Sequence, residues 1–320
     1  MLVAGVSAGF PSIAGVSLGF AITAASAQTN VALVIGNSAY QYARPLQTTI
    51  ADASAVAETL RAAGYDVTAL NDVRQSNIGQ VMRNFLDKVT AAGSNSVAFF
   101  YFAGYAAQSN GENYLIPVDA PITGAGDVAS QSLRLGDLVE ALAKTPAAAR
   151  IIVLDASRDH GFGRGTAEAV PPGLAIMEAP AGVAIASAAS PREVAVEGTG
   201  AYSVYTHALV TSMRQRGLEL DQIFKATRYQ VNQATGGKQT SWTSSALMVD
   251  ITLFAAPAAT PQRQEAERPQ PKEKEGRAER PHRKQAVRAA RPPAQSEPKP
   301  ATPPVTFGIG GGGIGIGIGR

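Results

Sequence analysis

The chain has 320 residues, with 28 Lys and Arg, 25 Asp and Glu, and no Cys, which excludes disulfide bonds, thiolate metal sites and a cysteine nucleophile. The net charge of +3 is unevenly distributed, because residues 255–307 hold 11 Lys and Arg against 6 Asp and Glu, whereas residues 1–254 hold 16 against 19. The basic character therefore belongs to a C-terminal segment, and we expect no specific nucleic-acid partner.

Residues 1–27 have the character of a secretory signal peptide. They contain no charged residue and end in Ala25-Ser26-Ala27, an Ala-x-Ala cleavage pattern. We expect an exported protein, periplasmic or secreted, whose mature chain starts near Gln28. The alternative is a membrane anchor formed by the same residues, because the basic residues that usually open a signal peptide are missing. The many Gly and Ser residues and the break at Pro11 disfavour a membrane-spanning helix.

Residues 28–254 are predicted to form one α/β domain. Apolar stretches typical of buried strands alternate with amphipathic stretches, about one pair every 30 residues. The predicted strands are 31–37, 65–70, 97–102, 151–154, 182–188 and an edge strand at 245–254. The predicted helices are 51–63, 76–93, 135–142, 203–213 and 220–233. This alternation predicts a doubly wound α/β sandwich.

The composition changes after residue 254. Residues 255–306 are dominated by Pro, Ala, Arg, Lys, Glu and Gln, which predicts a disordered linker. Residues 307–320 are rich in Gly and Ile, and so much glycine opposes a stable helix. We predict a flexible tail there.

Two strand exits carry the functional argument. The apolar strand 97–102 is followed by Ala103-Gly104-Tyr105-Ala106, and the apolar strand 151–154 is followed by Asp155-Ala156-Ser157-Arg158-Asp159. In open parallel sheets, ligands bind at the carboxyl ends of the strands. We therefore expect the functional groups to gather at these two exits.

The two exits resemble those of caspase-like cysteine peptidases, including bacterial metacaspase-type members. Residues 99–106 are similar to the family's Phe-Tyr-x-Gly-His-Gly exit, and residues 154–159 to its Asp-Ala-Cys-Arg-Asp segment. The caspase histidine precedes the cysteine by about 50 residues, and Tyr105 precedes Ser157 by 52. The resemblance covers about residues 30–254. It implies a three-layer caspase-like sandwich with a mostly parallel six-stranded sheet, helices on both faces and no separate second domain.

Both catalytic residue types of the family are replaced, by Tyr105 and Ser157. A serine hydroxyl needs a well-placed general base, and a tyrosine, with a pKa near 10 as a free side chain, is mainly a hydrogen-bond donor at neutral pH. We therefore expect a hydrogen-bonded pair and a pseudo-peptidase. The alternative interpretations are a turn residue for Ser157 and a ring packed over the crevice for Tyr105.

The resemblance also implies a substrate pocket. Metacaspase-type relatives hold a substrate Arg or Lys between carboxylates, and the matching positions here are Asp155 and Asp52. Paired carboxylates suit a guanidinium group. The alternatives are a turn residue for Asp155 and a helix N-terminal residue favoured by the helix dipole for Asp52. Trp242 resembles a residue of a family loop near the substrate groove, with simple packing as the alternative.

Other chemistry receives little support from the sequence. His160, three residues after Ser157, could serve a rebuilt serine hydrolase, although an incidental loop residue is the simpler interpretation. No metal-ligand spacing occurs, so we expect no metal and no cofactor. Calcium is implied by the family resemblance only, because no calcium-loop pattern is present.

Three functions remain open from the sequence. The first is a catalytically inactive caspase-like protein that binds peptide or protein segments containing Arg or Lys, its own basic tail among them. The second is an active endopeptidase that uses Ser157 and cleaves after Arg or Lys. The third is an envelope-associated structural protein whose basic tail contacts an anionic surface.

Overall fold

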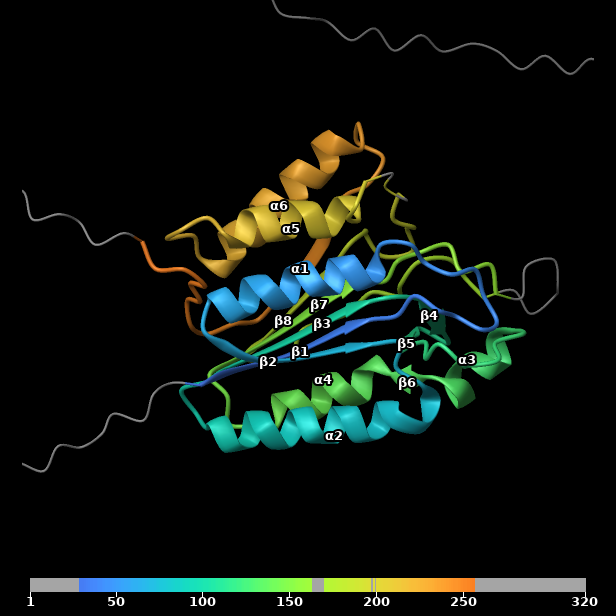
Figure 1. The fold of residues 1–320 in the computed structure, drawn as a ribbon, viewed down its shortest axis with the longest axis horizontal. Helices are drawn as coiled ribbons and strands as arrows, with labels where there is room; N and C mark the ends of the chain where they lie inside the picture. Colours follow the sequence, from blue (N-terminus) through green and yellow to red (C-terminus); the bar gives the residue numbers. More distant parts are fainter. Residues whose placement is uncertain (1–28, 163–169, 197, 199, 257–320) are drawn as a thin grey trace, which may run out of the picture. The chain divides into compact units, whose positions relative to one another are not determined.

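A six-stranded sheet forms the middle layer of the computed structural model (Figure 1). Its strands, in spatial order, are β2 (Tyr65–Asn71), β1 (Asn30–Gly36), β3 (Val97–Ala103), β7 (Ala149–Asp155), β8 (Val183–Ser187) and β9 (Trp242–Ser245). The first five are parallel, and β9 runs antiparallel to β8 at the edge. The structure describes residues 29–162, 170–196, 198 and 200–256, all within the first compact unit, Met1–Thr260. The second unit, Pro261–Arg320, lies outside the described residues.

Helices cover both faces of this sheet, as Figure 1 shows. On one face lie α1 (Thr49–Ala62), α5 (Val204–Met213) and α6 (Leu220–Ala234). On the other lie α2 (Gln75–Ala92) and α4 (Leu135–Ala143). The predicted three-layer α/β sandwich with a mostly parallel six-stranded sheet is therefore confirmed.

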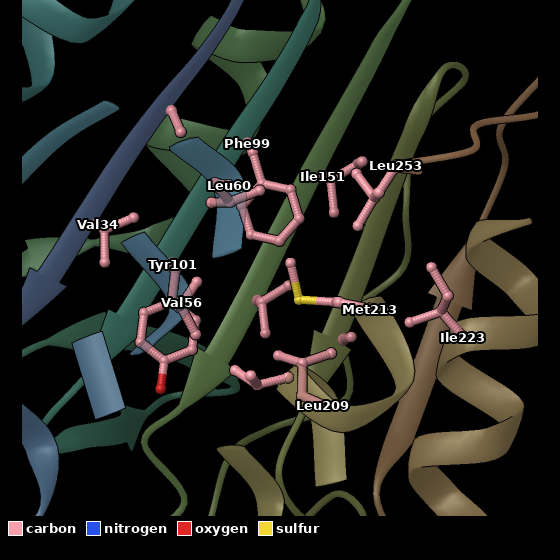
Figure 2. Packing of buried hydrophobic residues seen from close by; sticks show 14 of the residues in the cluster. Val34, Val56, Leu60, Phe99, Tyr101, Ile151, Leu209, Met213, Ile223 and Leu253 are labelled. Carbon is pink, nitrogen blue, oxygen red and sulfur yellow. The ribbon is translucent and has the colours of Figure 1, made fainter. Parts of the chain in front are cut away.

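The side chains of the central strands alternate between two cores. In β3, Phe99 and Tyr101 face the helices α1, α5 and α6, whereas Phe100 and Phe102 face α2 and α4. Figure 2 shows the first core, which Leu60 of α1, Leu209 of α5 and these two β3 rings share. A strand with both faces covered must be apolar at every position, which explains the uninterrupted apolar stretch that β3 shows in the sequence.

A second, smaller sheet follows β3 and was not predicted. It consists of β4 (Ala106–Ser109), β5 (Glu112–Leu115) and β6 (Leu133–Arg134), all antiparallel, with α3 (Ala125–Gln131) between the last two in sequence. Asn110 and Gly111 join β4 to β5 with φ values of 51° and 81°. Positive φ at both positions is the geometry of a tight hairpin turn, and Asn-Gly is its preferred sequence.

The prediction of the final edge strand at 245–254 is wrong. The strand is β9, Trp242–Ser245, and of the later residues up to 256 only Thr252 takes part in sheet pairing, through an isolated bridge to Glu219. Leu247, Ile251 and Phe254 are partly buried against the core below α5 and α6, so this apolar stretch packs as an irregular segment. Apolar character alone does not distinguish such a segment from a strand.

Several predictions concern residues outside those described, namely the signal peptide 1–27 and nearly all of the linker and tail 255–320. Among the helices that are described, none is both long and apolar enough to cross a membrane.

Candidate functional site

The two strand exits lie side by side. Ala103 of β3 pairs with Asp155 of β7, and beyond this pair the Gly104 and Ala106 amides donate to the carbonyls of Asp155 and Ala156, both at 3.3 Å. Gly104 cannot be replaced without displacement of its neighbours, because a Cβ there would lie 2.6 Å from the Tyr40 hydroxyl. The structure thus brings the segments that carry Tyr105 and Ser157 together at the carboxyl edge of the sheet.

Tyr105 is a buried member of an aromatic cluster. Its ring centroid lies 4.7 Å from that of Tyr40 and 5.8 Å from that of Phe162. Its backbone amide donates to the Tyr40 hydroxyl at 2.8 Å, and its own hydroxyl donates to the Arg44 carbonyl at 3.1 Å. The phenol is therefore held as a donor to the main chain.

Ser157 is completely buried, with 0% of its surface exposed. Its hydroxyl has no hydrogen-bond partner in the part of the chain that the structure describes. Its carbonyl accepts the Ala195 amide at 2.6 Å, so a loop that follows β8 lies against it. The expected hydrogen bond between Tyr105 and Ser157 is not formed, because the packing of the Tyr105 ring turns its hydroxyl towards Arg44.

Asp52 and Asp155 converge on Arg158. Nη2 of Arg158 lies 3.1 Å from Oδ1 of Asp155 and 3.6 Å from Oδ2 of Asp52. Asp52 is 0%, Asp155 1% and Arg158 7% exposed. A guanidinium group from the chain itself therefore lies between the two carboxylates that the sequence assigned to a substrate side chain. We call these three residues the acid–arginine cluster.

The start of α5 donates hydrogen bonds to both carboxylates, whereas Oδ2 of Asp52 has no hydrogen-bond partner among the described residues. Ser203 caps this helix, and its backbone amide donates to Oδ1 of Asp52 at 2.8 Å. The hydroxyls of Ser203 and Thr206 donate to Oδ2 of Asp155, at 2.5 and 2.9 Å. Since the single hydroxyl hydrogen of Thr206 is used in this way, the Tyr101 hydroxyl, 2.6 Å away, is the donor to Thr206.

Burial and charge shift the acid–base properties of the cluster. Burial, reinforced by the neighbouring Asp155, raises the pKa of Asp52 to about 7, although the Ser203 amide, Thr48 and Arg158 act in the opposite direction. Burial lowers the pKa of Arg158, but the charges of Asp155 and Asp52 outweigh it and raise the pKa overall. Arg158 therefore stays cationic, and the Asp52 carboxyl titrates near neutral pH.

The other candidate residues, Trp242 and His160, have different surroundings. Trp242 begins β9, opposite Ser187, and its side chain is 46% exposed. His160 stacks on Phe162 with ring centroids 4.8 Å apart, and its Nδ1 accepts the Phe162 amide at 3.1 Å. In a neutral imidazole this bond leaves the proton on Nε2, so neither nitrogen is available to accept a proton from Ser157.

Three residues of this site had no role assigned from the sequence: Arg158 of the cluster, and Ser203 and Thr206, which bind its carboxylates. Arg158 follows Asp155 by three positions, and this Asp-x-x-Arg spacing is a signal that could have indicated an ion pair. Ser203 and Thr206 lie about 50 residues further on, and no sequence pattern connects them with Asp155. No group of three or more potential metal-ligating side chains occurs among the described residues.

Comparison with known families agrees with this geometry. The model of the caspase domain family matches residues 29–251. A search among curated proteins gives no match.

Proposed function

Since the chain belongs to the caspase domain family, we propose that it is an exported, metacaspase-type member that has lost peptidase activity and binds peptide or protein segments containing Arg or Lys. The observation that carries the proposal is the state of Ser157. The residue at the nucleophile position is a fully buried serine whose hydroxyl contacts no base among the described residues. The chain contains no cysteine that could replace it.

The residue at the histidine position supports the same conclusion. Acyl transfer needs a base that accepts the nucleophile's proton. The Tyr105 hydroxyl instead donates to a main-chain carbonyl inside an aromatic cluster. A phenol that donates to a carbonyl and makes no hydrogen bond with the Ser157 hydroxyl does not supply this base.

The acid–arginine cluster supports the proposed binding chemistry. Two buried carboxylates around one guanidinium group form an arrangement suited to an arginine side chain. Because Arg158 already fills it, a peptide arginine must displace Arg158 in order to bind there. We therefore propose that binding in this cluster is weak in the native chain and is governed by the position of the Arg158 side chain.

The proposal is tested with peptides that end in arginine, and with citrulline analogues that keep the shape and lose the charge. The full chain should bind the arginine peptide more tightly than the analogue, and Arg158→Ala should strengthen this binding at least tenfold. Asp52→Asn should weaken it. Equal binding of the two peptides by both proteins would overturn the binding role.

Activity is tested separately, with fluorogenic Arg and Lys peptides. We expect no turnover by the full chain, with or without calcium. Turnover that disappears in Ser157→Ala would show a working serine peptidase and would contradict the proposal. Turnover that persists in Ser157→Ala would come from a contaminant.

A further inference from the structure

A groove of about 460 Å³ lies away from the acid–arginine cluster and shares no lining residue with it. Its walls are the β4–β5 hairpin at residues 111–113, the beginning of α4 with residues up to Glu140, and the segment 176–180 that precedes β8. We call it the hairpin groove. Its position makes it independent of the function proposed above.

One wall of the hairpin groove is a main-chain segment with unused hydrogen-bonding groups. Before it, the side chain of Asn113 holds both the amide and the carbonyl of Ala175, at 2.8 and 3.1 Å. After it, the Ala179 amide donates to Ser244 at 3.0 Å. Between these anchors, the backbone groups of residues 176–178 make no hydrogen bonds within the described part of the chain. Fixed ends and unpaired groups are the properties of a sheet edge that can accept another strand.

The side chains of this segment alternate in the manner of a strand. Ile176 is 63% exposed and Glu178 is exposed, whereas Met177 and Ala179 pack against the core shared with α2 and α4. A large exposed aliphatic side chain beside a groove gives an added strand an apolar contact. Because of this alternation, a peptide bound along the segment would meet the side chains of Ile176 and Glu178 on the exposed face.

The charge of the hairpin groove is negative. Glu112, Glu140 and Glu178 line it together with Arg134. Arg134 is already paired with Glu112 at 2.9 Å and with Asp137 at 2.7 Å. Among the described residues, Glu140 and Glu178 form no ion pair, so two carboxylates are left for a cationic ligand.

We propose that the hairpin groove binds an extended basic peptide segment of another protein, which adds as a strand along residues 176–178. Its main chain pairs with the unused backbone groups. Its Lys or Arg side chains meet Glu140 and Glu178, and an apolar side chain covers Ile176. Strand addition supplies affinity through the main chain, and the alternating side chains supply specificity.

The probe is the labelled peptide acetyl-Val-Thr-Arg-Thr-Val-Thr-Arg-amide, titrated against the full chain, because Ile176 and Glu178 share one face and this peptide alternates Val and Arg along one face of a strand. We expect saturable binding that Glu140→Gln/Glu178→Gln weakens at least tenfold and Ile176→Ser weakens several-fold. The control Glu58→Gln/Asp87→Asn changes net charge by the same amount at exposed positions outside the groove. Equal weakening by the control and the groove variant would indicate general electrostatic attraction and overturn the proposal.

Two further measurements separate the modes of binding. Two further peptides carry N-methyl groups on alternate backbone nitrogens, one on the odd and one on the even positions. Their affinities should differ, because only one of these two sets of amides faces the protein in an added strand. Equal affinity of both methylated peptides and the parent would rule out strand addition. Binding that Asp52→Asn removes and that Glu140→Gln/Glu178→Gln leaves intact would assign the peptide to the acid–arginine cluster and overturn the proposal.

Discussion

Arg158 Nη2 lies 3.1 Å from Oδ1 of Asp155, three residues earlier in the same strand exit. This ion pair joins two residues of the same strand exit, and Asp52 of α1 adds the second carboxylate of the cluster. A charged group is buried at low cost only when opposite charges accompany it. The ion pairs of Arg158 are therefore a structural requirement of this fold as well as an obstacle to ligands.

Replacement of Arg158 by Ala should destabilise the protein by about 3–5 kcal/mol, because it leaves two buried carboxylates without their cation. The free energy of unfolding in urea measures the loss. The matched control is Arg134→Ala, whose partners Glu112 and Asp137 are at the surface, and which should cost much less. A similar loss in the free energy of unfolding for both variants would show that the buried ion pairs of Arg158 stabilise the protein no more than the surface pairs of Arg134.

The stability of the protein should fall as the pH rises from about 4 towards 7. In this range Asp52 is protonated in the folded protein, because its pKa is raised to about 7, and ionised in the unfolded chain. Between these two pKa values the folded state binds one more proton than the unfolded state. The stabilisation due to this proton is therefore complete below the pKa of the unfolded chain, and it is lost as the pH rises through the pKa of the folded protein. The slope due to this group is about 1.4 kcal/mol per pH unit.

Asp52→Asn should remove that slope, since an amide does not titrate. Unfolding in urea at pH 4.5, 5.5, 6.5 and 7.5 compares the two proteins. The difference in stability between variant and native chain should change in favour of the variant as the pH rises. A constant difference across this range would show that Asp52 titrates at its ordinary pKa.

Two buried tyrosines provide a matched test of hydroxyl pairing. The Tyr101 hydroxyl donates to Thr206, whereas the Tyr205 hydroxyl has no partner among the described residues. Tyr101→Phe should cost about 0.5–1.5 kcal/mol, and Tyr205→Phe should be neutral or stabilising, because it removes an unpaired buried polar group. Thermal and urea unfolding of both variants measure the difference, and the reverse order would contradict the hydrogen-bond assignment.

The burial of Ser157 can be measured with a thiol, because the chain has no cysteine of its own. The Ser157→Cys thiol should react with an aromatic disulfide reagent at least a hundredfold more slowly in the folded protein than in urea. Ser54→Cys, on the exposed side of α1, is the control and should react at once in both states. Rapid labelling at position 157 would mean that the nucleophile position is open to substrates.

The sequence allowed the layers of the fold to be predicted, because a buried parallel strand such as β3 must be apolar at every position. It also placed Tyr105 and Ser157 at strand exits, because the apolar stretches that precede them end there, whereas the pairing of β3 with β7 comes from the structure. The small sheet β4–β6 was missed because its strands have two to four residues. The Asp-x-x-Arg spacing could have indicated the pair of Asp155 with Arg158, but the approach of Asp52 and the hydrogen bond from Ser203 could not be predicted, because they depend on how distant segments of the chain pack.

The hydrogen bond from the Ser203 amide to Asp52 joins positions 151 residues apart. During synthesis, a nascent chain that ends at β8 would hold Asp52, Asp155 and Arg158 without the hydrogen bonds that Ser203 and Thr206 donate to the two acids. The cluster can therefore close only after the start of α5 has left the ribosome, late in folding, as contacts of such long sequence separation require. Prematurely terminated products should accordingly be recognised as incomplete by proteases, because their central strands end in carboxylates that lack the hydrogen bonds of α5.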